Sequence, residues 1–163
     1  MNFPIKNIAV SPVIYKDKFL LIKRVKWPYK NLWSLPGGKV EPGEHPDETI
    51  IREIYEETSL MVKFIKMRGV VSEFLKNKNR LEGHFVIWVC ETKLKSGLAT
   101  HQNEGEVKWL TKEEIIRTKK NIIPSDFEMI NTFFFKSRKN LIIHKSHMKK
   151  QGKTYILEYF DSQ

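Results

Sequence analysis

The sequence predicts a mixed α/β domain of the α+β type, an α/β/α sandwich in which helices cover both faces of a mixed sheet. Short apolar segments typical of strands occur before, between and after a few amphipathic helical segments. Hydrophobic residues make up 40% of the 163 residues, including 10 Phe and 4 Trp, which excludes a disordered polyelectrolyte. The length suits one core, so we expect residues 1–163 to form a single domain.

The first expected strands lie near the N-terminus. Residues 8–10 and 13–15 are apolar segments, and a third apolar segment covers residues 19–22. The polar trio 16–18 has the composition of a hairpin turn. These segments therefore predict a hairpin that turns at this trio.

Two longer strands are expected in the middle of the chain. Residues 62–74 are interrupted by Gly69, and residues 81–90 are rich in β-branched and aromatic side chains. The polar stretch 76–80 between them predicts a second hairpin. The single cysteine, Cys90, has apolar neighbours that raise a thiol pKa, so we expect a buried hydrophobic residue in a reducing, cytoplasmic compartment rather than a nucleophile.

Three segments carry helix signals. The clearest is 46–58, where a proline suits the first helical position and two acidic residues follow in the first turn. Residues 111–118 open with the Thr-x-x-Glu pattern of a capping box. The third helix follows Pro124, where large apolar residues recur at helical spacing and are expected to face the core. These residues are Phe127, Ile130, Phe133 and Phe134.

The C-terminal part of the chain is basic. Residues 141–143 and 155–157 are apolar, which predicts a possible terminal β-hairpin that turns near 151–152. The formal net charge of the chain is +10, and residues 136–153 carry seven basic side chains and no acidic one. We therefore treat residues 136–163 as a basic C-terminal extension.

This positive charge has two interpretations. Lysines that are simply spread over solvated faces would explain it, and a surface that attracts polyanions such as nucleotides, RNA or acidic lipid heads is the functional alternative. The extension can also pair at a sheet edge, so both a monomer and a homodimer are open. Neither a signal peptide nor an apolar run of membrane-spanning length is present, so no membrane partner is expected.

The helix expected at 46–58 concentrates acid in this basic chain. At about 100° per residue, Glu53, Glu56 and Glu57 fall on one face. Like charges at these spacings destabilise a helix by roughly 0.2–0.5 kcal/mol per pair. The cluster is either a solvated acidic face or a binding site for Mg²⁺ or Mn²⁺, which prefer hard oxygen ligands.

The stretch that precedes this helix favours the metal site. Residues 35–44, LPGGKVEPGE, hold three glycines and two prolines, which specify a tight loop whose backbone can approach a ligand closely. A backbone carbonyl of such a loop can join a metal shell. The helix N-terminus behind it can face phosphate.

Together, this loop and helix resemble the signature of the Nudix (MutT-like) hydrolases over residues 38–60. The matching positions are Gly38, Glu44, Arg52, Glu53, Ile54, Glu56, Glu57 and Leu60. Segments 33–37 and 104–110 also look familial, so the resemblance is expected to extend over residues 5–135. Ser59 departs from the signature, because the family has Gly there, in a left-handed helix cap that costs other residues about 1 kcal/mol.

The resemblance implies a Nudix-like sandwich and a metal-dependent enzyme. Nudix enzymes hydrolyse a nucleoside diphosphate linked to another moiety, X, through attack of water on a pyrophosphate phosphorus. The implied ligands of Mg²⁺ or Mn²⁺ are the side chains of Glu53, Glu56 and Glu57 and the carbonyl of Gly38. Arg52 is implied to form an ion pair, with Glu44 as the partner, that orients the glutamates rather than touching substrate.

The resemblance leaves the general base open. Some family members use a glutamate of the signature helix, and others use one from the loop before the late strand, which here offers Glu104 and Glu106. We favour Glu104, because Glu106 lies closer to the expected strand and can have a structural role instead.

The substrate is predicted only as a nucleotide-type compound. Arg24 is a candidate contact for phosphate, and Trp27 and Phe74 are candidates for stacking on a base, although each aromatic residue can equally belong to the core. The family's sequence markers for ADP-ribose, dinucleoside polyphosphate and coenzyme A substrates are not evident. An RNA 5′ end held by the basic extension is a subsidiary hypothesis.

Two other classes of function stay open. A catalytically silent protein of this fold would bind nucleotides or nucleic acid, but a pure binder has no need of the clustered charge around Arg52. A basic nucleic-acid-binding module with an incidental acidic helix would leave the Gly/Pro loop unexplained.

Overall fold

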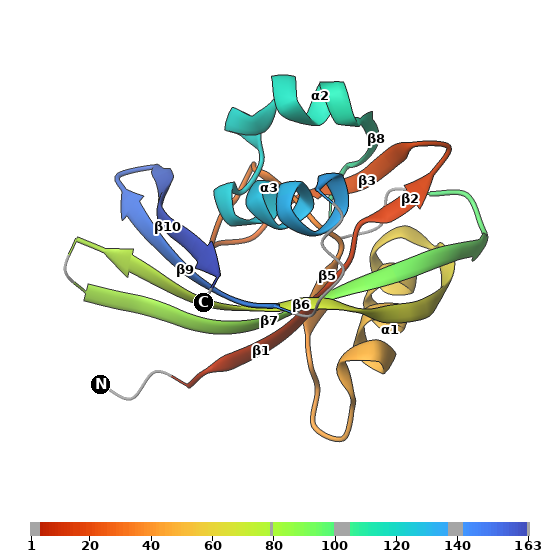
Figure 1. Cartoon of the computed structure of the whole chain (residues 1–163), viewed down its shortest axis with the longest axis horizontal. Helices are drawn as coiled ribbons and strands as arrows, with labels where there is room; N and C mark the ends of the chain where they lie inside the picture. The colour runs from red at the N-terminus through yellow and green to blue at the C-terminus, as the bar shows by residue number, and fades with distance from the viewer. Residues whose placement is uncertain (1–3, 79, 100–104, 137–141, 163) are drawn as a thin grey trace.

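A mixed sheet of six strands forms the centre of the fold (Figure 1). The computed structural model describes residues 4–78, 80–99, 105–136 and 142–162. In spatial order the strands are β10 (Thr154–Ser162), β9 (Ile142–Gln151), β6 (Met61–Asn77), β7 (Arg80–Ser96), β1 (Lys6–Val10) and β5 (Gly37–Lys39). The β9–β6 and β1–β7 pairs are parallel and the other pairs are antiparallel, so the predicted mixed sheet is confirmed.

A smaller sheet packs beside the first. Its strands are β2 (Val13–Tyr15), β3 (Lys18–Lys23), β4 (Trp33–Ser34) and β8 (Val107–Thr111). Strand β3 pairs antiparallel with each of the other three. The predicted N-terminal hairpin is confirmed, and it turns at Lys16 and Asp17, whose φ angles of 48° and 60° suit a tight hairpin turn.

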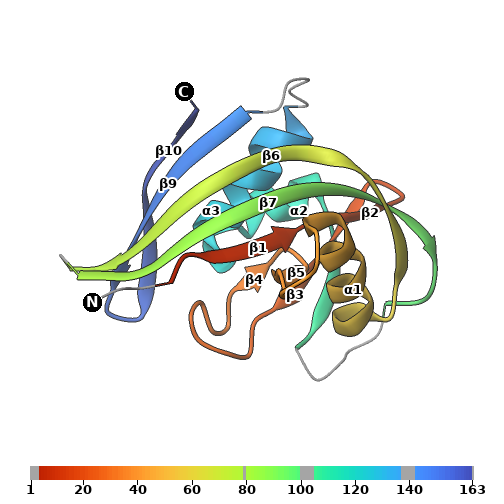
Figure 2. The ribbon, with the colours of Figure 1, turned by 90° about the horizontal axis from the view of Figure 1, so that it is seen from below.

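Helices lie on both faces of the six-stranded sheet, α1 on one and α2 and α3 on the other (Figures 1 and 2). Their bounds are α1 (Pro46–Thr58), α2 (Lys112–Arg117) and α3 (Pro124–Ile130), which continues as a π-helical turn at Asn131–Phe135, with a 3₁₀ turn at Lys119–Asn121. The predicted sandwich is therefore confirmed. Over the described ranges, none of these helices has the length and apolar run that a membrane span requires.

Each face of the sheet carries its own hydrophobic cluster. On the α1 side, Ile50 and Ile54 are fully buried against the sheet. On the other side, α3 and its π-helical turn bury Met129, Ile130 and Phe133. The apolar stripe predicted after Pro124 therefore faces the core, as its helical spacing requires.

The two long hairpins extend further than the sequence predicted. Strands β6 and β7 continue beyond their apolar segments, and the pairing register shifts beside Gly69, so that β6 bends instead of breaking. The predicted C-terminal hairpin is confirmed and turns at Gly152 and Lys153. Because β9 pairs with β6, this hairpin is part of the central sheet.

The Gly/Pro stretch begins with a strand that the sequence did not predict. Strand β5 pairs with β1, and a Cβ at Gly37 would overlap the carbonyl oxygen of Ala9. Gly37 also has φ of 142°, so only glycine permits this close pairing. The remainder of the stretch is the expected loop, in which Gly43 has φ of 91°.

Cys90 is buried in β7. Burial, with a smaller effect from the charge of Asp47, raises the pKa of the Cys90 thiol to about 12. The interpretation of this cysteine as a buried hydrophobic residue is confirmed.

Candidate active site

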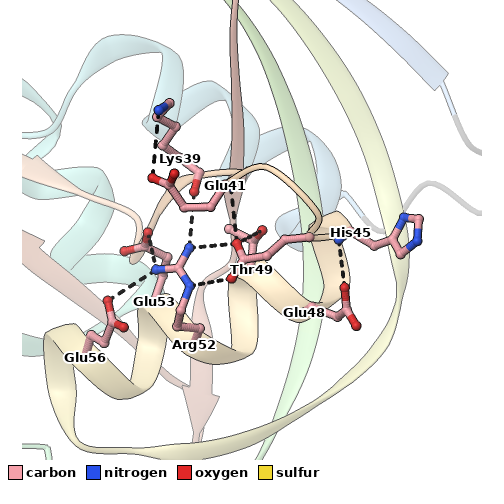
Figure 3. Close-up of polar contacts among 9 residues, drawn as sticks. Lys39, Glu41, His45, Glu48, Thr49, Arg52, Glu53 and Glu56 are labelled. Atoms are coloured by element: carbon pink, nitrogen blue, oxygen red, sulfur yellow. Dashed lines mark hydrogen bonds and ion pairs between the residues drawn. The ribbon is translucent and has the colours of Figure 1, made fainter.

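The residues at its two ends explain where α1 begins and ends. Pro46 takes the first helical position, and the carboxylate of Glu48 accepts a hydrogen bond of 2.8 Å from the N–H of His45 (Figure 3). At the other end Ser59 has φ of 61°, and its N–H donates to the carbonyl of Tyr55 at 2.8 Å. The left-handed cap expected there is present, with serine in the place of glycine.

Arg52 lies at the centre of a polar cluster between α1 and the loop before it (Figure 3). Its Nε and Nη2 donate to the two carboxylate oxygens of Glu44, at 2.6 and 2.9 Å. Its Nη1 donates to Glu53 at 2.8 Å and to Glu56 at 3.2 Å. Nη2 also donates to the carbonyl of Lys39, at 3.2 Å. The structure thus contains the expected Arg52–Glu44 pair, which ties two helix glutamates to the loop.

Arg52 also sets the ionisation of its partner. The hydrogen bonds from Arg52 lower the pKa of the Glu44 carboxyl to about 2. In return, the hydrogen bonds to Glu44 raise the pKa of Arg52 above its usual range. Both groups are therefore charged at neutral pH, and the fork-shaped guanidinium keeps a fixed orientation.

The glycine-rich strand β5 lies directly against this cluster. A Cβ at Gly38 would overlap the carboxylate of Glu53, so glycine is the residue that leaves room for this side chain. The N–H of Gly37 donates to Oε2 of the buried Glu57 at 2.9 Å. Strand β5 thereby lies against Glu53 and Glu57, two of the predicted metal ligands.

These ligands fit the predicted metal by their chemistry. Mg²⁺ and Mn²⁺ bind hard carboxylate and carbonyl oxygens. Within the described ranges, however, no three acidic, histidine or cysteine side chains converge as a ready metal site. Arg52 instead donates to Glu53 and Glu56, and the N–H of Gly37 donates to Glu57. These donors offset the mutual repulsion of carboxylates, which is the role that a divalent ion would also fill.

A cavity of about 360 Å³ extends from Gly38 between the sheet and α3. Most of its wall is apolar, as in typical small-molecule sites. The apolar lining includes Ile8, Val10, Phe85, Ile87, Ile123 and Met129. Its volume suits an organic group the size of a nucleoside.

Two buried carboxyl groups line this cavity. Asp126 accepts a hydrogen bond from the N–H of Leu35 at 2.7 Å, and burial raises its pKa to about 7. Glu73 accepts from the hydroxyls of Tyr29, at 3.2 Å, and Ser146, at 3.3 Å. Burial also raises the pKa of Glu73. The cavity therefore offers groups that can accept or, when protonated, donate a hydrogen bond.

Of the three predicted substrate contacts, two lie at the cavity and one does not. Arg24 and Trp27 line the cavity. Phe74 packs against His84, with ring centroids 4.5 Å apart. Successive residues of a strand point to opposite faces, so Glu73 of β6 lines the cavity while its neighbour Phe74 points away from it.

The two loop candidates for the general base lie before β8. Glu104 falls outside the described residues, so its role stays a prediction. Glu106 forms an ion pair of 3.7 Å with Lys23, and its carbonyl accepts from the N–H of Lys23 at 2.8 Å. Glu106 thus has the structural role that was expected for it. This role was the reason for favouring Glu104 as the general base.

Sequence reasoning missed the two buried acids of the cavity. Glu73 occupies an inward-facing position between Val71 and Leu75, and an acid in the apolar phase of an alternating strand is a signal that could have found it. Asp126 lies in the first turn of α3, where an acidic residue has an ordinary explanation in the helix dipole. Nothing in the local sequence marked its burial.

Comparison with known proteins gives a family match. Residues 6–133 match the model of the NUDIX domain. An ADP-ribose pyrophosphatase of Methanocaldococcus jannaschii is 50% identical over 66 residues, which cover 40% of this chain and 39% of the relative. A MutT-like protein of Streptomyces ambofaciens is 30% identical over 115 residues, which cover 69% of this chain and 68% of the relative. The match to the archaeal relative thus spans well under half of that protein.

A solved structure shares the fold over its whole length. The crystal structure of a mutator MutT protein from Bacillus halodurans superposes with a TM-score of 0.79 at 21% sequence identity. The superposition covers 98% of this chain and 98% of the other. At this identity the likeness concerns the fold alone.

Proposed function

Because this chain belongs to the Nudix family, we propose that it is a metal-dependent hydrolase of a nucleoside diphosphate linked to another moiety, X. The name of one relative, ADP-ribose pyrophosphatase, points to the same type of reaction. The observation that carries the proposal is the Arg52 cluster, which joins an acidic helix to a glycine-rich strand at the edge of a cavity.

The acidic cluster would hold the metal ion. The proposed ligands of Mg²⁺ or Mn²⁺ are Glu53, Glu56, Glu57 and the carbonyl of Gly38. When bound, the ion supplies neutralisation of the pyrophosphate charge and a lowered pKa for a bound water. Arg52 is a positioning residue: by binding both oxygens of Glu44 it orients the helix glutamates without touching substrate.

The attacking water must lose a proton to a base. We assign this role to Glu104, because Glu106 is engaged with Lys23 through an ion pair. A glutamate of α1 is the remaining candidate. Whichever carboxylate accepts the proton must lie within hydrogen-bond reach of the water.

The cavity is proposed to hold the nucleoside. Its apolar walls suit the faces of a base, whereas Asp126 and Glu73 provide partners for N–H and O–H groups on its edge. Arg24 adds positive charge to the lining. Substrates whose bases present hydrogen-bond donors are therefore expected to be preferred.

Release of phosphate-containing products from a nucleotide panel tests this proposal. The panel holds nucleoside triphosphates, ADP-ribose, dinucleoside polyphosphates and nucleotide sugars, each with Mg²⁺ or Mn²⁺. We expect turnover of at least one nucleoside diphosphate derivative. We also expect a loss of at least about 100-fold in Glu56→Gln and in Glu57→Gln, since each removes a charged metal ligand.

Glu113→Gln is the matched control, because it removes the same charge from an exposed position on α2. Its activity is expected to equal that of the unmodified chain. Absence of turnover with every diphosphate, or turnover that survives both Glu56→Gln and Glu57→Gln, contradicts the proposal. Nucleotide binding without turnover would support the catalytically silent alternative.

A further inference from the structure

The hairpin formed by β9 and β10 lies beyond the part of the chain that matches the family model, which ends at residue 133. It packs at the end of the sheet beside α3 (Figure 1). From there it reaches the candidate active site. Side chains of this hairpin contact three residues that line the cavity: Trp27, Tyr29 and Glu73.

Two of these three residues belong to loop 24–32, which forms part of the cavity wall. The loop is closed at its base by hydrogen bonds from the N–H of Arg24 to the carbonyl of Leu32, at 2.9 Å, and from the N–H of Asn31 to the carbonyl of Arg24, at 2.8 Å. Across the loop, Nε of Arg24 donates to the carbonyl of Pro28 at 3.0 Å. The far side of the loop is in contact with the hairpin.

Tyr155 of β10 holds one side of the loop. Its hydroxyl oxygen accepts a hydrogen bond of 3.3 Å from the N–H of Tyr29, and the two rings lie with centroids 4.4 Å apart. Tyr29 is buried, and its own hydroxyl donates to Glu73 in the cavity. Tyr155 therefore fixes both the backbone and the ring of a residue that holds a cavity carboxyl group.

Strand β9 adds two further contacts. The ammonium group of Lys150 lies 5.4 Å from the ring centroid of Trp27, within the range of a cation–π interaction. The hydroxyl of Ser146 donates to Glu73 at 3.3 Å. The adjacent Lys149 forms an ion pair with Glu158 instead. The alternation of the strand thus directs Lys150, and not Lys149, toward the loop.

We propose that the C-terminal hairpin, through Tyr155 and Lys150, positions Tyr29 and Trp27 and so sets the affinity of the cavity for the organic part of the substrate. This inference rests on the proposed function and deepens it. Tyr155 and Lys150 are positioning residues, since they act through the loop. Changes in the hairpin are expected to alter binding, whereas the chemistry at α1 stays intact.

Substitutions of Tyr155 test this role through the split between KM and kcat. Tyr155→Phe removes only the accepted hydrogen bond and is expected to raise KM about fivefold, the equivalent of one neutral hydrogen bond. Tyr155→Ala also removes the ring contact and is expected to raise KM further. In both variants kcat is expected to stay within about twofold, because lost uniform binding changes KM alone.

Each variant has a matched control in the same hairpin. Tyr159 is another tyrosine of β10, but its ring packs against His147, with centroids 5.4 Å apart, and not against loop 24–32. Tyr159→Ala is therefore expected to leave KM unchanged. Lys150→Gln removes the charge beside Trp27 and is likewise expected to raise KM, and Lys149→Gln is its control because Lys149 pairs with Glu158. Equal rises of KM in Tyr155→Ala and Tyr159→Ala, or a fall in kcat at unchanged KM, would overturn the proposal.

A second measurement needs no substrate. In the full chain labelled with 5-fluorotryptophan, the ¹⁹F NMR signal of Trp27 is assigned by its loss in Trp27→Phe. This signal is expected to shift in Lys150→Gln and in Tyr155→Ala, but not in Lys149→Gln. A signal that stays in place in both hairpin variants overturns the positioning role, whatever the activity.

The role of the hairpin can be tested even if the proposed reaction is wrong. If the unmodified chain hydrolyses nothing in the panel, the proposed reaction is wrong, and the Kd for ADP, measured by calorimetry, replaces KM in the same set of variants. A Kd that rises in Tyr155→Ala but not in Tyr159→Ala would still support the role of the hairpin. A Kd that is equal in the two variants would contradict it.

Discussion

Arg52 joins carboxylates that would otherwise repel one another. It binds Glu44 through two nitrogens and shares the third between Glu53 and Glu56. Because two of its nitrogens are engaged by Glu44, Arg52 has only one nitrogen left for Glu53 and Glu56. A metal ion that binds these two glutamates would therefore meet less competition from Arg52. Under the proposed function, this network would control how readily the acidic face takes a divalent ion.

Glu44→Gln tests this role of the pair. Without the Glu44 charge, Arg52 binds the helix glutamates more tightly, so we expect kcat/KM to fall by about 10- to 100-fold and the required Mg²⁺ concentration to rise. The free energy of unfolding should change little, since the pair is partly exposed and screened by solvent. Glu41→Gln, which removes an exposed loop acid paired with Lys39, is the control. An unchanged Mg²⁺ requirement in Glu44→Gln would contradict this view.

Asp126 gives a prediction for the pH dependence of stability. Its folded pKa is raised to about 7, whereas an unfolded aspartate has a pKa of about 4. Between these values the folded state binds more protons at Asp126 than the unfolded state does, so the contribution of Asp126 to the free energy of unfolding falls as pH rises from about 4 to about 7 and is level above that. Urea unfolding at several pH values measures this slope. The slope should be smaller in Asp126→Asn, and an identical slope in that variant would refute the assignment.

The end of α1 carries a strain that one substitution can relieve. Ser59 is held at φ of 61°, a left-handed conformation that glycine adopts without penalty. Ser59→Gly is therefore expected to raise the free energy of unfolding by about 1 kcal/mol, measured with urea. Ser96→Gly, at the end of β7, is the control, because Ser96 has no positive φ to relieve. Equal effects of the two substitutions would rule out the cap as the cause.

Elements with local signals were predictable from the sequence. The bounds of α1 follow from a proline, acidic residues and a capped end, and the hairpins follow from polar turns between apolar segments. The full lengths of β6 and β7 were not predictable, because polar residues alternate along their outer parts. Strand β5 was missed since its pairing depends on β1, a partner distant in sequence.

The candidate site also has a part that could be predicted from the sequence and a part that could not. The acidic face of α1 and the Arg52–Glu44 pair could be inferred from spacing and family resemblance. The cavity could not, since β1, β7, α3 and loop 24–32 each contribute part of its wall. A buried acid such as Asp126 becomes visible only when these distant segments are assembled.

Over the whole molecule, the acidic cluster stands out from a net charge of +10. Such a charge would attract an anionic substrate toward the protein. Two neighbouring lysines of the C-terminal extension make different contacts: Lys150 lies against Trp27, whereas Lys149 pairs with Glu158. An RNA 5′ end as substrate stays a prediction, and the charge of this surface is the feature that motivates it.

Under the proposed function, the glutamates of α1 hold a divalent ion that hydrolysis requires. The most direct measurement is the hydrolysis rate of the best panel substrate as Mg²⁺ is added to chelator-treated protein, for the unmodified chain and for Glu56→Gln. We expect no turnover without metal, a saturable rise with Mg²⁺, and at least about tenfold more Mg²⁺ needed by Glu56→Gln, if it turns over at all. Turnover in the presence of chelator, or the same Mg²⁺ dependence in both proteins, would contradict the claim.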